Sequence, residues 1–142
     1  MEEFEFLDDI ATADVAIESR GDTLEELFGA SATATFEVMV NTKGVKPRIK
    51  KVLCLESQEI DTLLFDWLSE LIYLKDVEYM VFSDFHIQIQ KDANYLLQAQ
   101  IFGEEICPTR HELRCDVKAV TYHLFDVSKK KGKWVSRFVL DI

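Results

Sequence analysis

The chain has 142 residues and a mass of 16.4 kDa, so we predict a single domain over residues 1–142. Its composition, 48% hydrophobic and 30% charged, is that of a globular protein and argues against an intrinsically disordered chain. Sixteen Lys and Arg against 26 Asp and Glu give a net charge of −10. We therefore expect no strong direct binding to nucleic-acid phosphates, whereas cations and basic proteins are expected partners.

The predicted elements begin with two strand-like segments, residues 4–6 and 15–17. A helix is expected to start at Asp22, whose carboxylate can cap free amides while Glu25 reaches back toward it. Apolar and small residues then follow helical spacing from Leu24 to Val38. The segment 41–44, which ends in glycine, predicts the end of this helix.

A second helix is expected after Ser57, which we interpret as its cap. Leucine, isoleucine and tryptophan side chains recur from Ile60 to Leu74 and make a wide apolar stripe. Because such a stripe needs another layer to cover it, this helix is predicted to pack on a sheet.

The remaining segments have the alternation or the composition of strands: residues 48–55, 85–89, 95–102, 117–127 and 134–141. In the fourth of these, Ala119, Thr121, His123 and Phe125 are expected on one face. The lysine-rich residues 129–133 read as a solvated hairpin turn before the last strand.

Two helices placed among about seven strands, in runs rather than in strict alternation, indicate an α+β fold with a mixed or antiparallel sheet. The simplest arrangement packs both helices on one face of that sheet. The last strand reaches the end of the sequence, so Asp141 and the terminal α-carboxylate are expected to be fixed by the sheet.

Enzyme chemistry has no specific support in the sequence. Cys107, His111 and Cys115 lack the ligand spacing of the common structural zinc sites, and a polar loop with reduced thiols is the simpler interpretation. There is no nucleophile elbow, no HExxH motif and no glycine-rich phosphate loop. The protein is therefore not expected to be an enzyme.

A site for a hard cation fits the residues better. Asp8, Asp9 and Asp14 cluster at a predicted break between strands, and the tail offers Asp141 and the α-carboxylate of Ile142. Calcium accepts irregular cages of carboxylate and carbonyl oxygens, although no EF-hand loop is present. The alternative is that these acids simply belong to the surface of an acidic protein.

Location can also be predicted. No apolar run approaches the ~20 residues that a bilayer span requires, so no membrane partner is expected. The first residues, Met1 to Glu5, are acidic where a secretory signal is basic, which predicts a cytoplasmic protein. An odd number of cysteines, three, is expected to stay reduced there.

Five parts of the sequence then carry a family resemblance: Thr12-Ala13-Asp14-Val15, residues 23–28, residues 63–74, residues 110–112 with 117–123, and Phe138-Val139-Leu140-Asp141-Ile142. In this order they resemble the T-A-D motif, the two helix motifs, the H-E and V-K-A-V-T-Y-H stretch and the closing strand of the archease family. The resemblance covers nearly the whole chain, and it implies the α+β archease fold.

The resemblance implies a function that composition does not reveal. Archeases are accessory proteins of the RtcB-type RNA ligase of tRNA splicing; they promote its guanylylation by GTP and its multiple turnover without joining RNA themselves. The family binds a divalent metal, taken to be Ca²⁺, through residues that correspond here to Asp14, Asp141 and the main chain of Ile142.

Ala11 stands where family members usually carry a histidine before T-A-D. Our candidates for contact with the ligase are three polar residues: Asp9, which precedes the T-A-D motif, and His111 and Glu112, which lie in a predicted loop. The alternative function is that of a general chaperone or modulator with several clients, which predicts a large exposed apolar patch.

Overall fold

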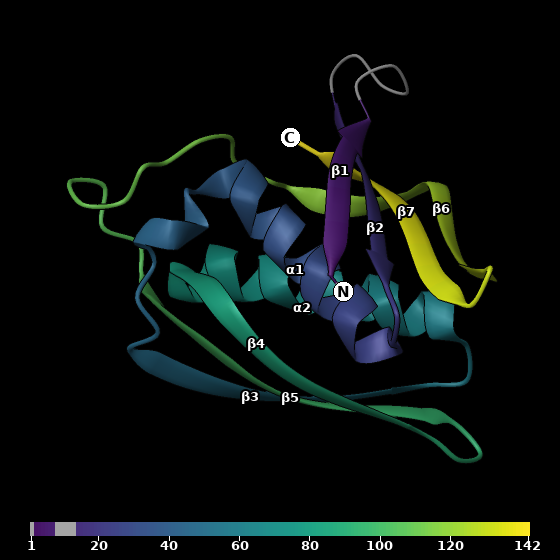
Figure 1. The fold of residues 1–142 in the computed structure, drawn as a ribbon. Coiled ribbons are helices and arrows are strands. Elements are labelled where there is room, and N and C mark those ends of the chain that lie inside the picture. The colour runs from purple at the N-terminus through teal and green to yellow at the C-terminus, as the bar shows by residue number, and fades with distance from the viewer. Residues whose placement is uncertain (1, 8–13) are drawn as a thin grey trace.

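The computed structural model describes residues 2–7 and 14–142 (Figure 1). Asp8, Asp9 and Ala11, on which predictions were made above, lie outside the described residues. The elements, in chain order, are β1 (Glu3–Leu7), β2 (Asp14–Gly21), α1 (Leu24–Met39), a 3-10 turn η1 (Thr42–Gly44), β3 (Ile49–Ser57), α2 (Ile60–Glu78), β4 (Met80–Lys91), β5 (Tyr95–Glu105), β6 (Ala119–Lys130) and β7 (Lys133–Asp141).

The described strands form two antiparallel sheets, one in the order β1-β2-β7-β6 and the other in the order β3-β5-β4. The helices α1 and α2 lie between them, so the molecule has three layers (Figure 1). The predicted α+β class with two helices on antiparallel sheet is confirmed, but the helices are covered on two sides rather than packed on one face of a single sheet. The reason is α1, which is buried at most positions around its circumference and therefore needs a layer on each side.

The start of α1 differs from the prediction by one residue. Thr23, not Asp22, is the N-cap: its hydroxyl accepts the N–H of Glu26 at 3.1 Å. The carboxylate of Glu26 in turn accepts the N–H of Asp22 at 2.8 Å. Asp and Thr are both favourable N-cap residues, so residue type does not distinguish positions 22 and 23. The cap is Thr23 because the helical backbone begins at Leu24. The predicted stop is confirmed, since α1 ends at Met39 and η1 follows.

The predicted cap of α2 was wrong. Ser57 is still part of β3, and Glu59 is the N-cap, with no side-chain hydrogen bond to the first turn. The predicted apolar stripe is confirmed, because the buried residues of α2 follow it from Leu63 to Leu74. Packing against both sheets therefore holds this helix in the absence of a strong cap.

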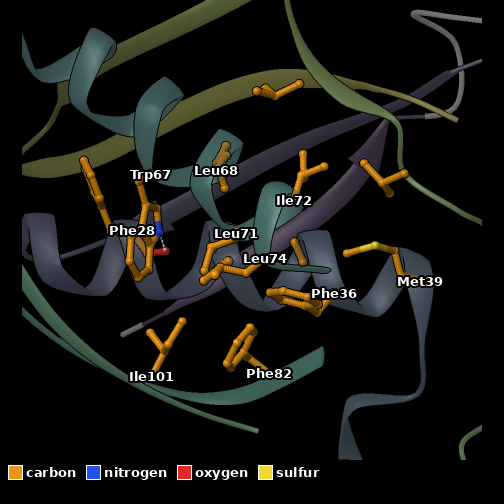
Figure 2. Packing of buried hydrophobic residues seen from close by; sticks show 14 of the residues in the cluster. Phe28, Phe36, Met39, Trp67, Leu68, Leu71, Ile72, Leu74, Phe82 and Ile101 are labelled. Atoms are coloured by element: carbon orange, nitrogen blue, oxygen red, sulfur yellow. Dashed lines mark hydrogen bonds between the residues drawn. The ribbon is translucent and has the colours of Figure 1, made fainter. Parts of the chain in front are cut away.

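Phe28 and Trp67 join the two helices at the centre of the core (Figure 2). Both side chains are fully buried, and the indole Nε1 of Trp67 donates to the carbonyl oxygen of Phe28 at 3.1 Å. Burial of a tryptophan is favourable only when its N–H finds an acceptor, and this bond supplies one.

Neither helix in the described part of the chain has the length and apolar content that crossing a bilayer requires.

The hairpin between β6 and β7 is confirmed. Lys130 pairs with Lys133, and the two turn residues, Lys131 and Gly132, have the positive φ angles of a two-residue hairpin loop.

The predicted alternation in β6 holds only to Thr121. Beyond it the register shifts, so the four residues 122–125 stand opposite Phe138 alone, and His123 and Phe125 do not continue the regular face.

Candidate metal centre and the adjoining loop

Asp14 and Asp141 are direct cross-strand partners. Asp14 begins β2 and Asp141 ends β7, and because these strands are antiparallel neighbours, the two residues meet at one edge of the sheet. Ala119 of β6 pairs with Asp141 from the other side. The main-chain oxygen of Asp141 accepts the N–H of Lys118 at 2.7 Å, so the backbone around Asp141 is fixed by both neighbouring strands.

Two carboxylates at directly opposed positions repel one another. Both are half-buried, and within residues 2–7 and 14–142 neither has a cationic partner within 4.0 Å. Ile142 directly follows Asp141 and packs, partly buried, against the core, so its main chain lies at the same edge. The donors available here are all oxygens, the ligand type that calcium prefers.

The structure brings Asp14, Asp141 and Ile142 together, and their role as metal ligands stays a prediction. Within the described residues no group of three or more His, Cys, Asp or Glu side chains is close enough to hold a metal. A cation at this edge would therefore take two side-chain carboxylates, the terminal or main-chain oxygens and water. That donor set suits Ca²⁺ better than zinc, which prefers nitrogen and sulfur.

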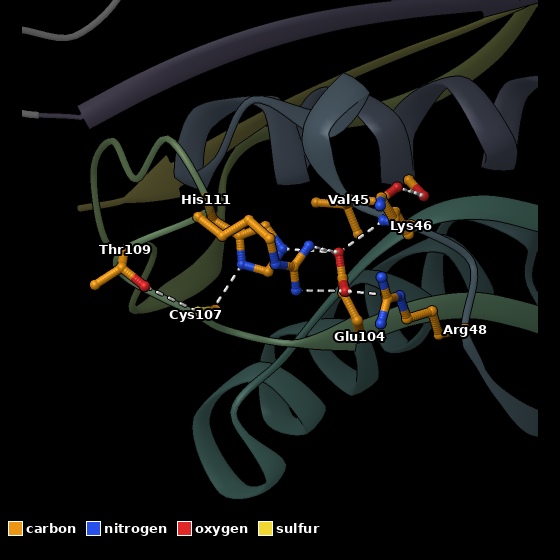
Figure 3. A network of polar contacts seen from close by, with 9 residues as sticks. Val45, Lys46, Arg48, Glu104, Cys107, Thr109 and His111 are labelled. Carbon is orange, nitrogen blue, oxygen red and sulfur yellow. Dashed lines mark hydrogen bonds and ion pairs between the residues drawn. The ribbon is translucent and has the colours of Figure 1, made fainter.

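His111 lies inside a network of polar contacts rather than at the surface (Figure 3). Its Nδ1 accepts the N–H of Cys107 at 2.8 Å, and its Nε2 lies 2.9 Å from a carboxylate oxygen of Glu104. Since Nδ1 is an acceptor, the proton is on Nε2 and is donated to Glu104. The imidazole thereby ties the loop after β5 to the end of that strand.

Glu104 is the centre of this network. It is 3% exposed, and it accepts two hydrogen bonds from Arg110 at 2.9 and 2.6 Å and a third from the N–H of Lys46 at 2.8 Å. The paired guanidinium of Arg110, aided by these N–H donors, outweighs burial and holds the pKa of Glu104 far below its usual range. Glu104 is therefore a buried, fully satisfied carboxylate.

These contacts change the interpretation of the predicted loop residues. The side chain of His111 is 0% exposed, so direct contact of the imidazole with a partner does not fit its place, although the loop that it holds can still meet one. Glu112 is exposed and pairs with Arg114 at 2.8 Å. Its role in partner binding stays a prediction.

The zinc alternative is not supported by this arrangement. Both nitrogens of His111 are engaged, and the three cysteines are free. The thiol of Cys107 lies 3.4 Å from the hydroxyl of Thr109, and this contact and nearby backbone N–H groups lower the pKa of Cys107. The loop is thus closed by hydrogen bonds, as the simpler interpretation expected.

Sequence reasoning missed Lys75, although a signal was present. It falls on the apolar stripe of α2, four residues after Leu71, and its side chain is 7% exposed. Burial opposes the charge of the ammonium, but the hydrogen bonds that it donates to the carboxylates of Asp116 and Asp76, each at 2.5 Å, outweigh burial and raise the pKa of Lys75. The ammonium also donates to the Val117 oxygen at 2.9 Å, one residue before the N–H that holds Asp141.

Comparison with known proteins gives one family. The model of the archease protein family matches residues 4–142. The protein archease of Pyrococcus furiosus is 41% identical over 133 residues, which are 92% of this chain and 94% of that protein. That of Methanothermobacter thermautotrophicus is 38% identical over 143 residues, which span both proteins completely.

Solved structures agree. The solution structure of Methanobacterium thermoautotrophicum protein 1598 superposes with a TM-score of 0.86 at 38% identity, over 98% of each chain. The crystal structure of a Thermotoga maritima archease, described as a possible chaperone, gives a TM-score of 0.64 at 21% identity over 93% of each chain, which shows a common fold. By the family match and these relatives, the chain belongs to the archease family.

Proposed function

We propose that this protein is a metal-binding accessory protein of an RtcB-type RNA ligase in tRNA splicing. It promotes guanylylation of the ligase by GTP and so allows repeated turnover, without joining RNA itself. Membership of the archease family supports the class of protein. The observation that carries the proposal is the cross-strand pairing of Asp14 with Asp141 beside the terminal residue.

The cation would be held by the carboxylates of Asp14 and Asp141 and by a main-chain oxygen of Ile142. A divalent ion between the carboxylates removes their mutual repulsion and supplies a fixed positive charge at the edge of the sheet. Binding to the folded state alone also stabilises that state by mass action. We propose Ca²⁺ because the donors are oxygens in an irregular arrangement.

The test is nucleotide loading and multiple-turnover RNA joining by the purified ligase. Wild-type protein with Ca²⁺ is expected to accelerate both, and Asp14→Asn to lose most of this acceleration. Asp92→Asn is the matched control, because Asp92 is an exposed acid in the hairpin of the other sheet. If wild-type protein with Ca²⁺ leaves loading and turnover unchanged, the proposal fails.

A general chaperone is the second candidate. It is favoured by the description of the Thermotoga maritima archease as a possible chaperone. This function predicts that the protein suppresses aggregation of unrelated heated proteins at equimolar ratio. Suppression without any effect on the ligase would favour it.

A further inference from the structure

A groove runs between α2 and β6, which is one of the two edge strands of the described four-stranded sheet. Its volume is ≈ 220 Å³. It begins beside the candidate metal centre, because Ala119, on its wall, is the cross-strand partner of Asp141. Its lining comes from two parts of the chain: from α2, and from the segment that enters β6. The residues are Ser69, Ile72, Tyr73 and Asp76 of α2, Lys118 just before β6, and Ala119 and Val120 of β6.

An aromatic pair lies at the contact between α2 and β6, about one helical turn before the groove in α2. The rings of Phe65 and Tyr122 are stacked, with centroids 4.0 Å apart and planes at 4°. Phe125 supports Phe65 edge-on at 5.5 Å. Despite the stack, Tyr122 is 73% exposed, so one face of its ring is open to solvent. Phe65 and Tyr122 therefore form a rigid aromatic platform at the surface.

The backbone that presents this platform is irregular. Residues 122–125 stand opposite Phe138 alone, and Leu124 has a φ of 56°, in the left-handed region. A bulky side chain rarely adopts that region, and a regular strand would have avoided it. Bulges at sheet edges commonly re-aim a side chain, and this one turns Tyr122 onto α2.

The charge around the platform is negative. Asp66 and Asp76 are exposed on α2, and Glu70, which lies between them in the sequence, is half-buried; Lys118 lines the groove together with Asp76. Asp76 is paired with Lys75. In the part of the chain that the structure describes, Asp66 and Glu70 have no cationic partner within 4.0 Å. Asp66 directly follows Phe65 in α2, so the platform adjoins an exposed carboxylate, and an exposed ring next to a carboxylate suits an arginine or lysine side chain.

We propose that this α2–β6 surface, defined by the groove, the Phe65–Tyr122 platform and Asp66, docks a basic rim of the ligase. The inference rests on the proposed function. An enzyme that holds RNA must present cations around its RNA-binding face. An arginine of that rim would stack on the open face of Tyr122 and bond to Asp66. Because the groove leads to Ala119 and Asp141, such docking would bring the candidate metal centre next to the ligase.

The test measures binding of purified ligase to immobilised protein, with association rates at several salt concentrations. Tyr122→Ala is expected to weaken binding about tenfold, and Tyr122→Phe, which keeps the ring, to restore it. Asp66→Lys is expected to slow association and to flatten its salt dependence. The controls are Tyr79→Asn, an exposed ring at a left-handed position that asparagine tolerates, and Glu105→Lys, an exposed acid at the end of β5.

Melting curves first establish that each variant is folded. Asp66→Lys changes an exposed position of α2 and leaves the stacked rings of Phe65 and Tyr122 in place, so it tests the surface even if Tyr122→Ala is unstable. If wild-type protein binds and activates the ligase, while Tyr122→Ala and Asp66→Lys bind as tightly as wild type, the docking surface is wrong and the proposed function stands. If wild-type protein neither binds nor activates, the proposed function fails, and this inference fails with it.

Discussion

Asp14 and Asp141, which stand near opposite ends of the sequence, are direct partners across β2 and β7. No loop is needed to bring them together, because the last strand of the chain lies in the interior of the four-stranded sheet. The backbone hydrogen bonds between β2 and β7 therefore fix the positions of the two residues relative to each other. A site built on strands is better ordered than one built on loops.

The first prediction concerns the charge of the pair. Without Ca²⁺, Asp14→Asn is expected to melt at the same temperature as wild type or slightly higher, because one of two opposed charges is removed. With Ca²⁺ at about 100 times the wild-type dissociation constant, wild type should gain about 2.7 kcal/mol and the variant far less. Thermal melts with and without EGTA measure both. An equal calcium-dependent shift in the two proteins would contradict the assignment.

The second prediction concerns the terminal carboxylate. A C-terminal extension converts the α-carboxylate of Ile142 into a neutral amide and removes one negative oxygen from the edge of the sheet. Calcium affinity is expected to fall about tenfold, which corresponds to ~1.4 kcal/mol. Titration calorimetry on the extended protein, before and after proteolytic removal of the extension, makes the comparison. Equal affinities would show that the terminal carboxylate takes no part.

The third prediction concerns the buried carboxylate of Glu104. Its pKa is lowered in the folded state from the usual 4.5, so its contribution to stability is present above that value and is lost as the pH falls below it. Glu104→Gln is expected to cost about 3 kcal/mol at pH 7, because Arg110 and the Lys46 N–H lose a charged acceptor.

Urea unfolding from pH 7 to pH 3 provides the measurement. The difference between wild type and Glu104→Gln should shrink as the pH falls below about 4.5, since only the wild type loses this contribution. A difference that stays constant across the range would mean that the charge of Glu104 does not stabilise the loop.

The fourth prediction concerns the hydrogen bond between the helices. Trp67→Phe keeps an aromatic ring but leaves the Phe28 carbonyl oxygen without the indole donor, so we expect a loss of about 2 kcal/mol, and about 4 kcal/mol for Trp67→Ala. Chemical denaturation measures both. If Trp67→Phe were as stable as wild type, the bond would contribute nothing beyond packing.

Local patterns predicted the elements well because burial follows the period of each element. The stripe of α2 and the hairpin turn at Lys131 and Gly132 are both local features, and both were confirmed. The division into two sheets could not be predicted, because alternation shows which residues of a strand face the core but not which strands pair. In α1, small residues such as Gly29 and Ala32 are buried on sides that no apolar stripe marks.

Some residues of the candidate site and the adjoining loop could likewise be predicted from the sequence, and others could not. Asp14 and Asp141 could be selected because family resemblance marks them and because the last strand ends with one of them. Glu104 carried no local signal, since its partners, Arg110, His111 and Lys46, reach it through two separate connections. The bulge at residues 122–125 was missed because apolar alternation continues in the sequence where the backbone register does not.

The most direct test of the metal centre is a crystal structure of the untagged protein grown with terbium(III), a hard-cation substitute for calcium with strong anomalous scattering. We predict one dominant anomalous peak within coordination distance of carboxylate oxygens of both Asp14 and Asp141, and no such peak in Asp14→Asn crystals. A peak elsewhere, or carboxylates that point apart with no ion between them, would contradict the account.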